Sequence, residues 1–212
     1  MGINPGKLVE LNRDQTGSET DTFTEERYRQ FERYFTHGTS DVLDVGCNTG
    51  RGGDILKNLR PGLSITGLDC VPERLSALDP NIYQKSICSF TKDISLPNES
   101  FDAIVAGEFI EHVPPDEVFQ TLCEFFRLLR LKGKLLLTTP NPNYVKNVLL
   151  KASVLGGSHV SQHRPASLKR RLEDVGFSRI KIKGSGRVSR FLGENFPWRS
   201  IYGSYFIEAV KW

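Results

Sequence analysis

The sequence predicts a single α/β domain built on a doubly wound, mostly parallel sheet. From residue 41 onward, short apolar runs alternate with longer amphipathic segments, a pattern typical of strands connected by covering helices. A glycine-rich turn directly follows the first apolar run, at the place where open α/β sheets bind ligands. The length of 212 residues suits one domain of this kind.

One helix is predicted before the sheet begins. Residues 1–20 are polar with scattered Gly, Ser and Thr, so we expect a flexible N-terminus there and a folded domain at 21–212. Thr24 begins a helix that Gly38 ends. Its aromatic side chains recur at helical spacing: Tyr28, Phe31, Tyr34 and Phe35.

Strands and helices then alternate. The strand at 41–45 precedes a helix at 52–59, which Pro61-Gly62 closes. The clearest helix, 115–130, has one apolar face. Further strands are predicted at 63–68, 82–88, 101–106, 134–138, 179–182 and 204–210, and further helices at 72–78 and 167–175. The long connection 184–203 favours either a functional cover or a packed surface loop.

Composition limits the class of protein. No apolar run approaches the roughly 20 residues of a membrane span, and the first residues lack a signal peptide pattern. The four cysteines form no C-x-x-C pair and no cluster with histidine: Cys47, Cys70, Cys88 and Cys123. We therefore expect reduced thiols and a cytoplasmic protein.

The net charge of +3 hides an asymmetry. Residues 146–212 carry 13 Lys and Arg against 4 Asp and Glu, a net of +9, which leaves −6 for 1–145. A basic C-terminal third favours an anionic acceptor, a nucleic acid or a membrane surface, and a solvated basic face is the plain alternative. Peripheral association with a membrane stays open on this ground.

The turn 44–50, D-V-G-C-N-T-G, follows the first strand and opens a helix. Its glycines let the backbone approach a ligand, and a helix N-terminus offers free N–H groups. Its G-x-x-x-G spacing differs from the dinucleotide pattern G-x-G-x-x-G. Asp69 ends the second strand, where a carboxylate can accept hydrogen bonds from both ribose hydroxyls. Together the turn and Asp69 predict a nucleoside ligand.

Six motifs in this order resemble those of class I S-adenosylmethionine-dependent methyltransferases, over roughly 22–212. They are V-L-D-V-G-C-N-T-G at 42–50, G-L-D at 67–69, S-F-D-A-I-V-A at 100–106, E-F-I-E-H-V at 108–113, L-K-G-K-L-L-L at 131–137 and L-E-D-V-G-F at 172–177. The resemblance implies a Rossmann-like, seven-stranded sheet with an antiparallel last strand and helices on both faces. It also implies S-adenosyl-L-methionine as the cofactor.

The resemblance also assigns cofactor contacts. Asp44 would hold the amino group of the cofactor and Asp69 its ribose. Arg29 would hold its carboxylate, a task that suits a guanidinium, although an exposed helix arginine is the alternative. The other implied cofactor contacts are Gly46, Cys47, Asn48, Gly50, Cys70, Phe90, Glu108 and Phe109.

Two positions depart from the family pattern. Asn48 replaces the usual central glycine, and Asn is among the side chains that best tolerate a positive φ. Ser89-Phe90 stands where a Gly-Asp pair commonly contacts the adenine. We expect Phe90 to stack on the adenine or to pack in the core.

A hydroxyl acceptor must lose its proton during methyl transfer, which calls for a base. His112 is the first candidate, because imidazole titrates near neutral pH. Glu111 would orient His112 or hold a substrate amine; a capping pair that shapes the pocket is the alternative. His159 and His163, in a segment that resembles the acceptor-site insertion of ubiquinone-biosynthesis and sugar O-methyltransferases, come second, against a plain surface loop. No metal site is predicted, because further ligands cannot be named.

O-methylation of a small-molecule acceptor such as a quinol, a sugar or another metabolite is the favoured function. RNA or protein methylation is the second, although no N-P-P-Y or N-P-P-F tetrapeptide and no phosphate-tracking basic stretch supports a nucleic-acid partner. A non-catalytic, cofactor-binding regulatory subunit is the third. We expect a monomer or homodimer whose acceptor pocket comes from 21–37, 144–165 and 184–203.

Overall fold

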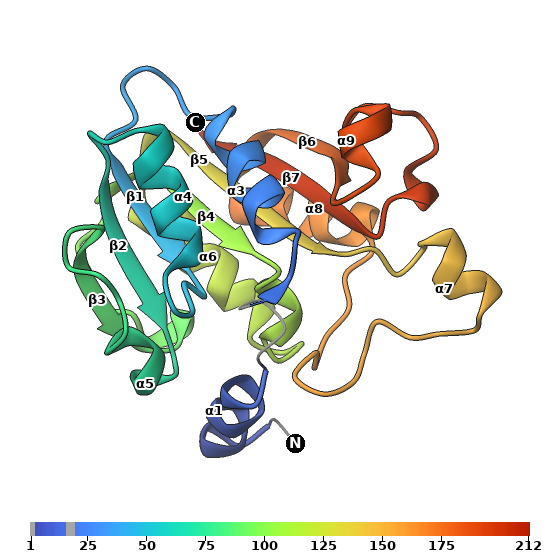
Figure 1. Ribbon diagram of the computed structural model, residues 1–212, viewed down its shortest axis with the longest axis horizontal. Helices are drawn as coiled ribbons and strands as arrows, with labels where there is room; N and C mark the ends of the chain where they lie inside the picture. The colour runs from blue at the N-terminus through green and yellow to red at the C-terminus, as the bar shows by residue number, and fades with distance from the viewer. Residues whose placement is uncertain (1–2, 16–19) are drawn as a thin grey trace.

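A seven-stranded mixed sheet forms the centre of the computed structural model, which describes residues 3–15 and 20–212 (Figure 1). Its order is β3-β2-β1-β4-β5-β7-β6. Strand β7 pairs antiparallel with both neighbours, and the other pairs are parallel. The predicted topology, with an antiparallel last strand, is confirmed. The strands are β1 (Asp41–Val45), β2 (Ser64–Asp69), β3 (Tyr83–Cys88), β4 (Phe101–Gly107), β5 (Leu129–Pro140), β6 (Phe177–Ser185) and β7 (Ser204–Lys211).

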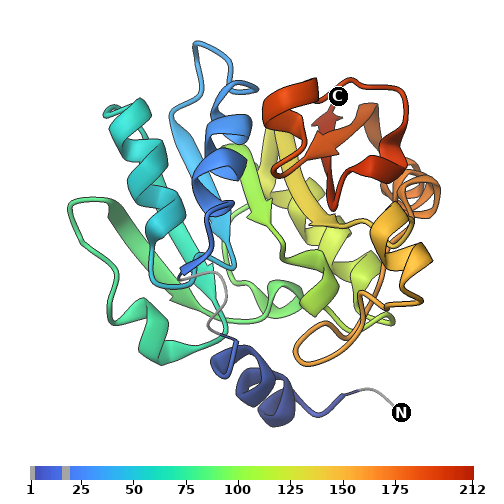
Figure 2. The ribbon, with the colours of Figure 1, turned by 45° about the vertical axis from the view of Figure 1, so that its right-hand side comes forward.

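Helices cover both faces of this sheet (Figures 1 and 2). Helices α3 (Thr24–Glu32) and α4 (Arg51–Leu59) pack on one face, and α6 (Val118–Leu128) and α8 (Pro165–Val175) pack on the other. Successive residues of β1 alternate between the two layers: Val42 belongs to the first apolar cluster, Leu43 to the second. Since both sides are buried, the central strands are continuous apolar runs.

A helix that the sequence pattern did not predict precedes this domain. Helix α1 (Pro5–Arg13) begins where the side chain of Asn4 accepts the N–H of Gly6 at 2.9 Å. The guanidinium of Arg74 donates to the carbonyls of Asn12 and, at 2.7 Å, Gln15. Part of the predicted flexible N-terminus is therefore helical and in long-range contact with Arg74, while residues 1–2 and 16–19 lie outside the described residues.

Element ends differ from the predicted ones by a few residues. Helix α3 ends at Glu32, before Gly38. Helix α6 ends at Leu128, because Leu129 adopts extended backbone and starts β5. The predicted long connection after β6 contains two short helices. The remaining elements are α5 (Pro72–Leu75), η1 (Thr91–Asp93), η2 (Ile110–His112), α7 (Val145–Leu149), α9 (Ser189–Leu192) and η3 (Arg199–Ile201). In the described part of the chain, none of the helices has the length and apolar content that a bilayer span requires.

Candidate functional site

A cavity of about 720 Å³ lies at the carboxyl ends of β1, β2 and β4, a size that suits a small organic ligand. It is the place that the topology of an open α/β sheet favours for binding. Several predicted site residues line it together: Gly46, Asn48, Asp69, Cys70, Phe90, Glu108, Phe109 and His112. The structure therefore brings the glycine-rich turn, the strand-end carboxylate and the first candidate base to one space.

The glycine-rich turn approaches the cavity with strained backbone that only certain residues accept. Gly46 has a φ of +67°, and a Cβ there would lie 3.0 Å from Cδ2 of Phe109. Asn48 has a φ of +51°, a conformation that Asn adopts more readily than most side chains. Its N–H donates to Oδ2 of Asp69 at 3.0 Å. This hydrogen bond fixes the glycine-rich turn relative to the end of β2 at the cavity wall.

Asp69 has the chemistry expected of a ribose ligand. It is nearly buried, yet it lines the cavity. The N–H of Val71 donates to its Oδ1 at 2.9 Å, and Nη1 of Arg74 lies 3.7 Å from its Oδ2. A carboxylate has about four acceptor positions, so the two backbone N–H groups leave capacity for two hydroxyls. The cavity and Asp69 together fit the nucleoside part of S-adenosylmethionine.

Asp44 lies beneath the turn rather than among the side chains that line the cavity. The hydroxyls of Tyr28 and Tyr83 donate to its two oxygens, at 2.6 and 2.7 Å. Burial raises the pKa of Asp44 to about 6, against the lowering effect of both tyrosines. Asp44 ties α3, β1 and β3 together, and its contact with the cofactor amino group stays a prediction.

Three other predicted cofactor contacts are not brought to the cavity. The side chain of Arg29 is 53% exposed and pairs with Glu25 at 2.9 Å. Cys47 is buried in the core, and Gly50 begins α4 with a φ of +94°. Arg27 lines the cavity in place of Arg29, with its Nε 3.8 Å from Oε1 of Glu108. The sequence did contain a signal for Arg27. It lies four residues before the buried Phe31 and therefore on the side of α3 that faces the sheet.

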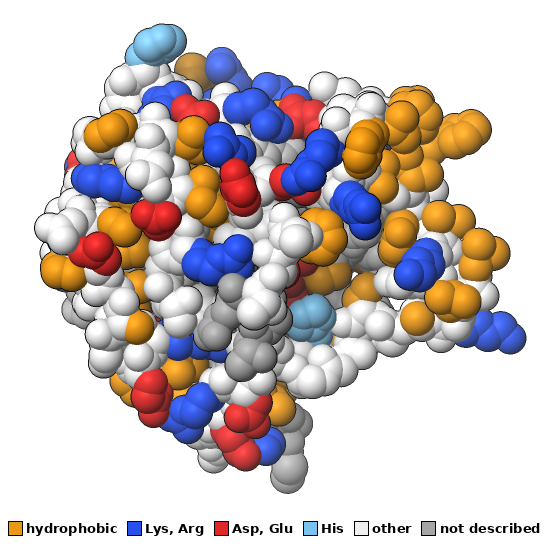
Figure 3. All heavy atoms as spheres, in the orientation of Figure 1, with side chains coloured by type: hydrophobic (Ala, Val, Ile, Leu, Met, Phe, Trp, Pro, Cys, Tyr) orange, Lys and Arg blue, Asp and Glu red, His pale blue; other side chains and the backbone are white. Residues whose placement is uncertain are grey.

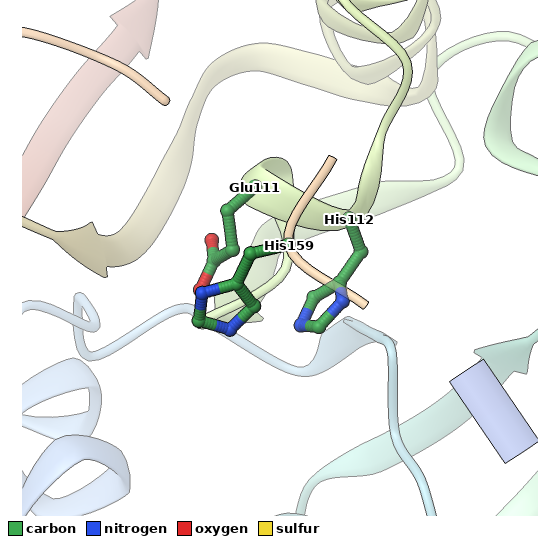
Figure 4. A group of neighbouring side chains, drawn as sticks. All are labelled: Glu111, His112 and His159. Atoms are coloured by element: carbon green, nitrogen blue, oxygen red, sulfur yellow. The ribbon is translucent and has the colours of Figure 1, made fainter. Parts of the chain in front are cut away.

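A second group of polar side chains lies at the cavity wall, to which His112 and His159 belong. Glu111, His112 and His159 offer ligand atoms that all lie within 4.8 Å of one another (Figure 4). Oε2 of Glu111 accepts the hydroxyl of Thr139 at 3.0 Å, and Oε1 has no partner among the residues that the structure describes. Burial, with a contribution from Glu108, raises the pKa of Glu111 well above its ordinary value.

The ring nitrogens of the two histidines have distinct tasks. Nδ1 of His112 lies 3.0 Å from the carbonyl of Ser158, and Nδ1 of His159 lies 2.9 Å from that of Val154. A carbonyl only accepts, so each Nδ1 carries a proton, and the neutral ring of His112 keeps a lone pair on Nε2. Burial lowers the pKa of His112 to about 4, which leaves the ring neutral at pH 7.

This group can act as a base or hold a divalent cation. The sequence offered no third metal ligand beside the histidines, and the structure supplies one in the buried carboxylate of Glu111. Imidazole nitrogen and carboxylate oxygen are ordinary ligands of first-row divalent cations. Glu111 itself does not line the cavity, whereas both histidines do.

His163 lies away from the cavity. It is buried, and its Nε2 lies 3.2 Å from the carbonyl of Ile110 and 2.8 Å from Oγ of Ser161. Burial lowers the pKa of His163 to about 4. His163 therefore connects η2 to the segment before α8, and it is not among the residues that line the cavity.

Comparison with known proteins agrees with this geometry. A family model described as "Methyltransferase domain" matches residues 43–137. The chain is 32% identical over 162 residues to the mitochondrial ubiquinone biosynthesis O-methyltransferase of Rattus norvegicus, covering 68% of this chain and 46% of that protein. It is 32% identical over 132 residues to a Xanthomonas oryzae pv. oryzae enzyme of the same name, covering 58% of this chain and 52% of that one. It therefore spans about half the length of the curated relatives it matches.

Solved structures share the fold. A SAM-dependent methyltransferase from Archaeoglobus fulgidus superposes with a TM-score of 0.69 at 22% identity, over 99% of this chain and 100% of that one. The phosphoethanolamine N-methyltransferase 2 of Haemonchus contortus, in complex with S-adenosyl-L-methionine, superposes with a TM-score of 0.68 at 15% identity. That match covers 96% of this chain and 60% of the other.

Proposed function

Because the chain belongs to the class I S-adenosylmethionine-dependent methyltransferases, we propose that it transfers the methyl group of that cofactor to an oxygen of a small-molecule acceptor. One observation carries this proposal. A single cavity is lined both by the predicted cofactor residues Gly46 and Asp69 and by the two histidines, His112 and His159. The curated relatives reported above are named as O-methyltransferases, which supports oxygen as the acceptor atom.

The chain itself supplies alignment and a place for the proton. Bound S-adenosylmethionine supplies a methyl group activated on a sulfonium. Asp69 and the turn at Gly46 hold the cofactor, which converts methyl transfer into a reaction between aligned partners. Nε2 of His112 accepts the proton of the acceptor hydroxyl as the new C–O bond forms. Glu111, which accepts a hydrogen bond from the hydroxyl of Thr139, lies next to His112 behind the cavity wall.

A divalent cation held by Glu111, His112 and His159 would lower the pKa of an acceptor hydroxyl and so promote the same proton loss. In either arrangement the acceptor oxygen lies at these three side chains. Methylation of a neutral nitrogen needs less help, because such a nitrogen already carries a free lone pair. The buried, proton-accepting surroundings therefore favour an oxygen acceptor.

The four cysteines are free thiols, which supports our proposal of a reducing compartment, the cytoplasm. We propose a small acceptor rather than RNA because α1 residues such as Leu8 and Asn12 form part of the cavity wall. A small RNA methyltransferase is among the structural neighbours at 15% identity, which is a likeness of fold alone.

Two measurements test the proposal. Titration calorimetry with S-adenosylhomocysteine should give one-site binding that Asp69→Ala abolishes. Asp79→Ala, which removes an exposed carboxylate between α5 and β3, should retain that binding. Transfer of labelled methyl groups into cell extract should then mark the metabolite fraction. Label found only in RNA or protein, or absence of binding heat, contradicts the proposal.

A further inference from the structure

One end of the molecule combines exposed apolar side chains with basic ones (Figure 3). We call it the apolar end; it consists of α7 with the residues that follow it and of the segment from α9 to η3. Leu149, Phe191 and Trp198 are 76%, 75% and 71% exposed. Its large apolar side chains are Val145, Val148, Leu149, Leu150, Leu155, Phe191, Leu192 and Trp198.

The apolar side chains of α7 surround the helix instead of forming a stripe. Val148, Leu149 and Leu150 are consecutive, and each is more than half exposed. Consecutive residues in a helix point about 100° apart, so no single flat partner surface can cover all three. Figure 1 shows α7 extending away from the sheet. Such a projection suits a medium that encloses it, as the interfacial region of a bilayer does.

The charge of this end has one sign. Segment 141–164 contains Lys146, Lys151 and Arg164 and no acidic residue. Segment 184–203 contains three arginines and one acid, Glu194, whose carboxylate already pairs with Lys183 at 2.8 Å. Of the three arginines, Arg190 pairs with Glu26. Exposed Lys and Arg around exposed apolar side chains favour a surface that is both apolar and anionic.

The same two segments form part of the cavity wall. Tyr144, just before α7, and Lys146, within it, line the cavity, and so do Arg187 and Val188, just before α9. A molecule dissolved in a partner that covers the apolar end therefore lies next to the cavity. This continuity distinguishes the apolar end from isolated exposed residues elsewhere, such as Leu131 at the far end of β5.

We propose that the apolar end docks on an anionic lipid bilayer, with the side chains of α7, Phe191 and Trp198 in the interface and the basic residues at the headgroups. Docking then brings an acceptor dissolved in the bilayer to the cavity mouth, a consequence that rests on the proposed function. The docking itself requires neither cofactor nor acceptor, so it can be tested separately.

Vesicle sedimentation of the full chain tests docking. We expect the protein to sediment with phosphatidylcholine vesicles that contain about a third phosphatidylglycerol, and to bind pure phosphatidylcholine far less, because anionic headgroups attract the basic residues. Leu149→Ser with Leu150→Ser should weaken binding by at least about tenfold, since each buried leucine contributes more than a tenfold change. Lys151→Glu should weaken binding to the anionic vesicles only.

Matched variants and the cofactor control complete the design. Leu131→Ser removes an equally exposed leucine at the far end of β5, and Lys85→Glu reverses a charge on β3; both should bind as the parent does. Calorimetry with S-adenosylhomocysteine should be the same for all variants, which separates this test from that of the proposed function. Protein that stays in the supernatant, or binding insensitive to the double leucine variant, overturns the proposal. So does light scattering that shows a dimer which only the double variant dissociates, because a second copy would then cover the apolar end.

Discussion

His112 ends η2, and His163, 51 positions later in the sequence, packs against the same short helix; their hydrogen bonds separate their roles. In His112 the protonated nitrogen points to the carbonyl of Ser158, which leaves Nε2 for the cavity. In His163 it is Nε2 that contacts a backbone carbonyl, that of Ile110. Sequence motifs made both histidines candidates for the base, and only His112 has the geometry for it.

Replacement of His112 tests this role. We expect His112→Ala to lower kcat by about 10²–10⁴-fold, the usual contribution of a general base, with unchanged affinity for S-adenosylhomocysteine. His37→Ala, which removes an exposed histidine, serves as the control. Single-turnover methyl transfer measures the rate, and turnover of His112→Ala equal to that of the parent would remove the residue from the mechanism.

His163 makes stability depend on pH. Its pKa is lowered to about 4 in the folded state, whereas an unfolded histidine titrates near 6.5. Between these values the unfolded chain binds more protons, so the free energy of unfolding falls as the pH falls from about 6.5 to 4. Relative to His163→Gln, which keeps hydrogen-bonding atoms but does not titrate, the parent should lose up to about 3 kcal/mol over this window. Urea unfolding at pH 7 and pH 4.5 measures the difference; parallel losses in both proteins would refute it.

Metal binding can be measured directly at the acceptor side. Oε1 of Glu111 has no hydrogen-bond partner among the described residues, and this carboxyl group is buried next to the imidazoles of His112 and His159. We expect Mn²⁺ to bind to the chelator-treated protein in calorimetry, and chelation to reduce turnover. Glu111→Gln should abolish the binding heat, whereas Glu117→Gln, which alters a carboxylate paired with Lys92, should retain it. Heat that is equal for the parent and Glu111→Gln would place the cation elsewhere.

At the scale of elements, α4 packs against tyrosines through two glycines. A Cβ at Gly52 would lie 2.0 Å from Cζ of Tyr28, and one at Gly53 would lie 2.2 Å from the hydroxyl of Tyr83. Both tyrosines donate to Asp44. The close approach of α4 therefore keeps both tyrosines in contact with Asp44, beneath the glycine-rich turn.

Gly52→Ala tests this packing. In an open helix position the change to alanine stabilises, but here the tyrosine ring must move, and overpacking costs about 1–3 kcal/mol. We expect a lower urea midpoint for Gly52→Ala and an unchanged one for Gly62→Ala, where an added Cβ meets nothing within 4 Å. Equal midpoints for the two variants would show that α4 can shift away without loss.

Elements with a local signal were predictable, and those held by distant contacts were not. Strand β1 has the predicted bounds, because an apolar run closed by a glycine turn specifies it locally. Helix α1 has a polar sequence, and Arg74, about 60 residues away, holds its carbonyls. Similarly, the choice of Arg27 over Arg29 depends on which side of α3 faces Glu108, and this becomes visible only once the helix is docked.

For the whole molecule, the cofactor side was more predictable than the acceptor side. The turn at Gly46 and Asp69 are contiguous motifs whose spacing encodes their geometry, although the placement of Asp44 beneath the turn was not visible in it. The side that we propose for the acceptor is lined by residues of η2, the loop with His159 and the connection before β7. Glu111 became a candidate metal ligand only because the fold brings His159 beside it, 48 positions later in the chain.

The attachment of α1 has a consequence for the kinetics. Arg74 lies beside Asp69 and also holds the carbonyls of Asn12 and Gln15, whose residues line the cavity. One guanidinium thus joins the carboxylate that we propose as the ribose ligand to the helix that borders the cavity. By linkage, whatever tightens one contact steadies the other. We therefore expect release of the spent nucleoside to require loosening of the nine-residue helix α1.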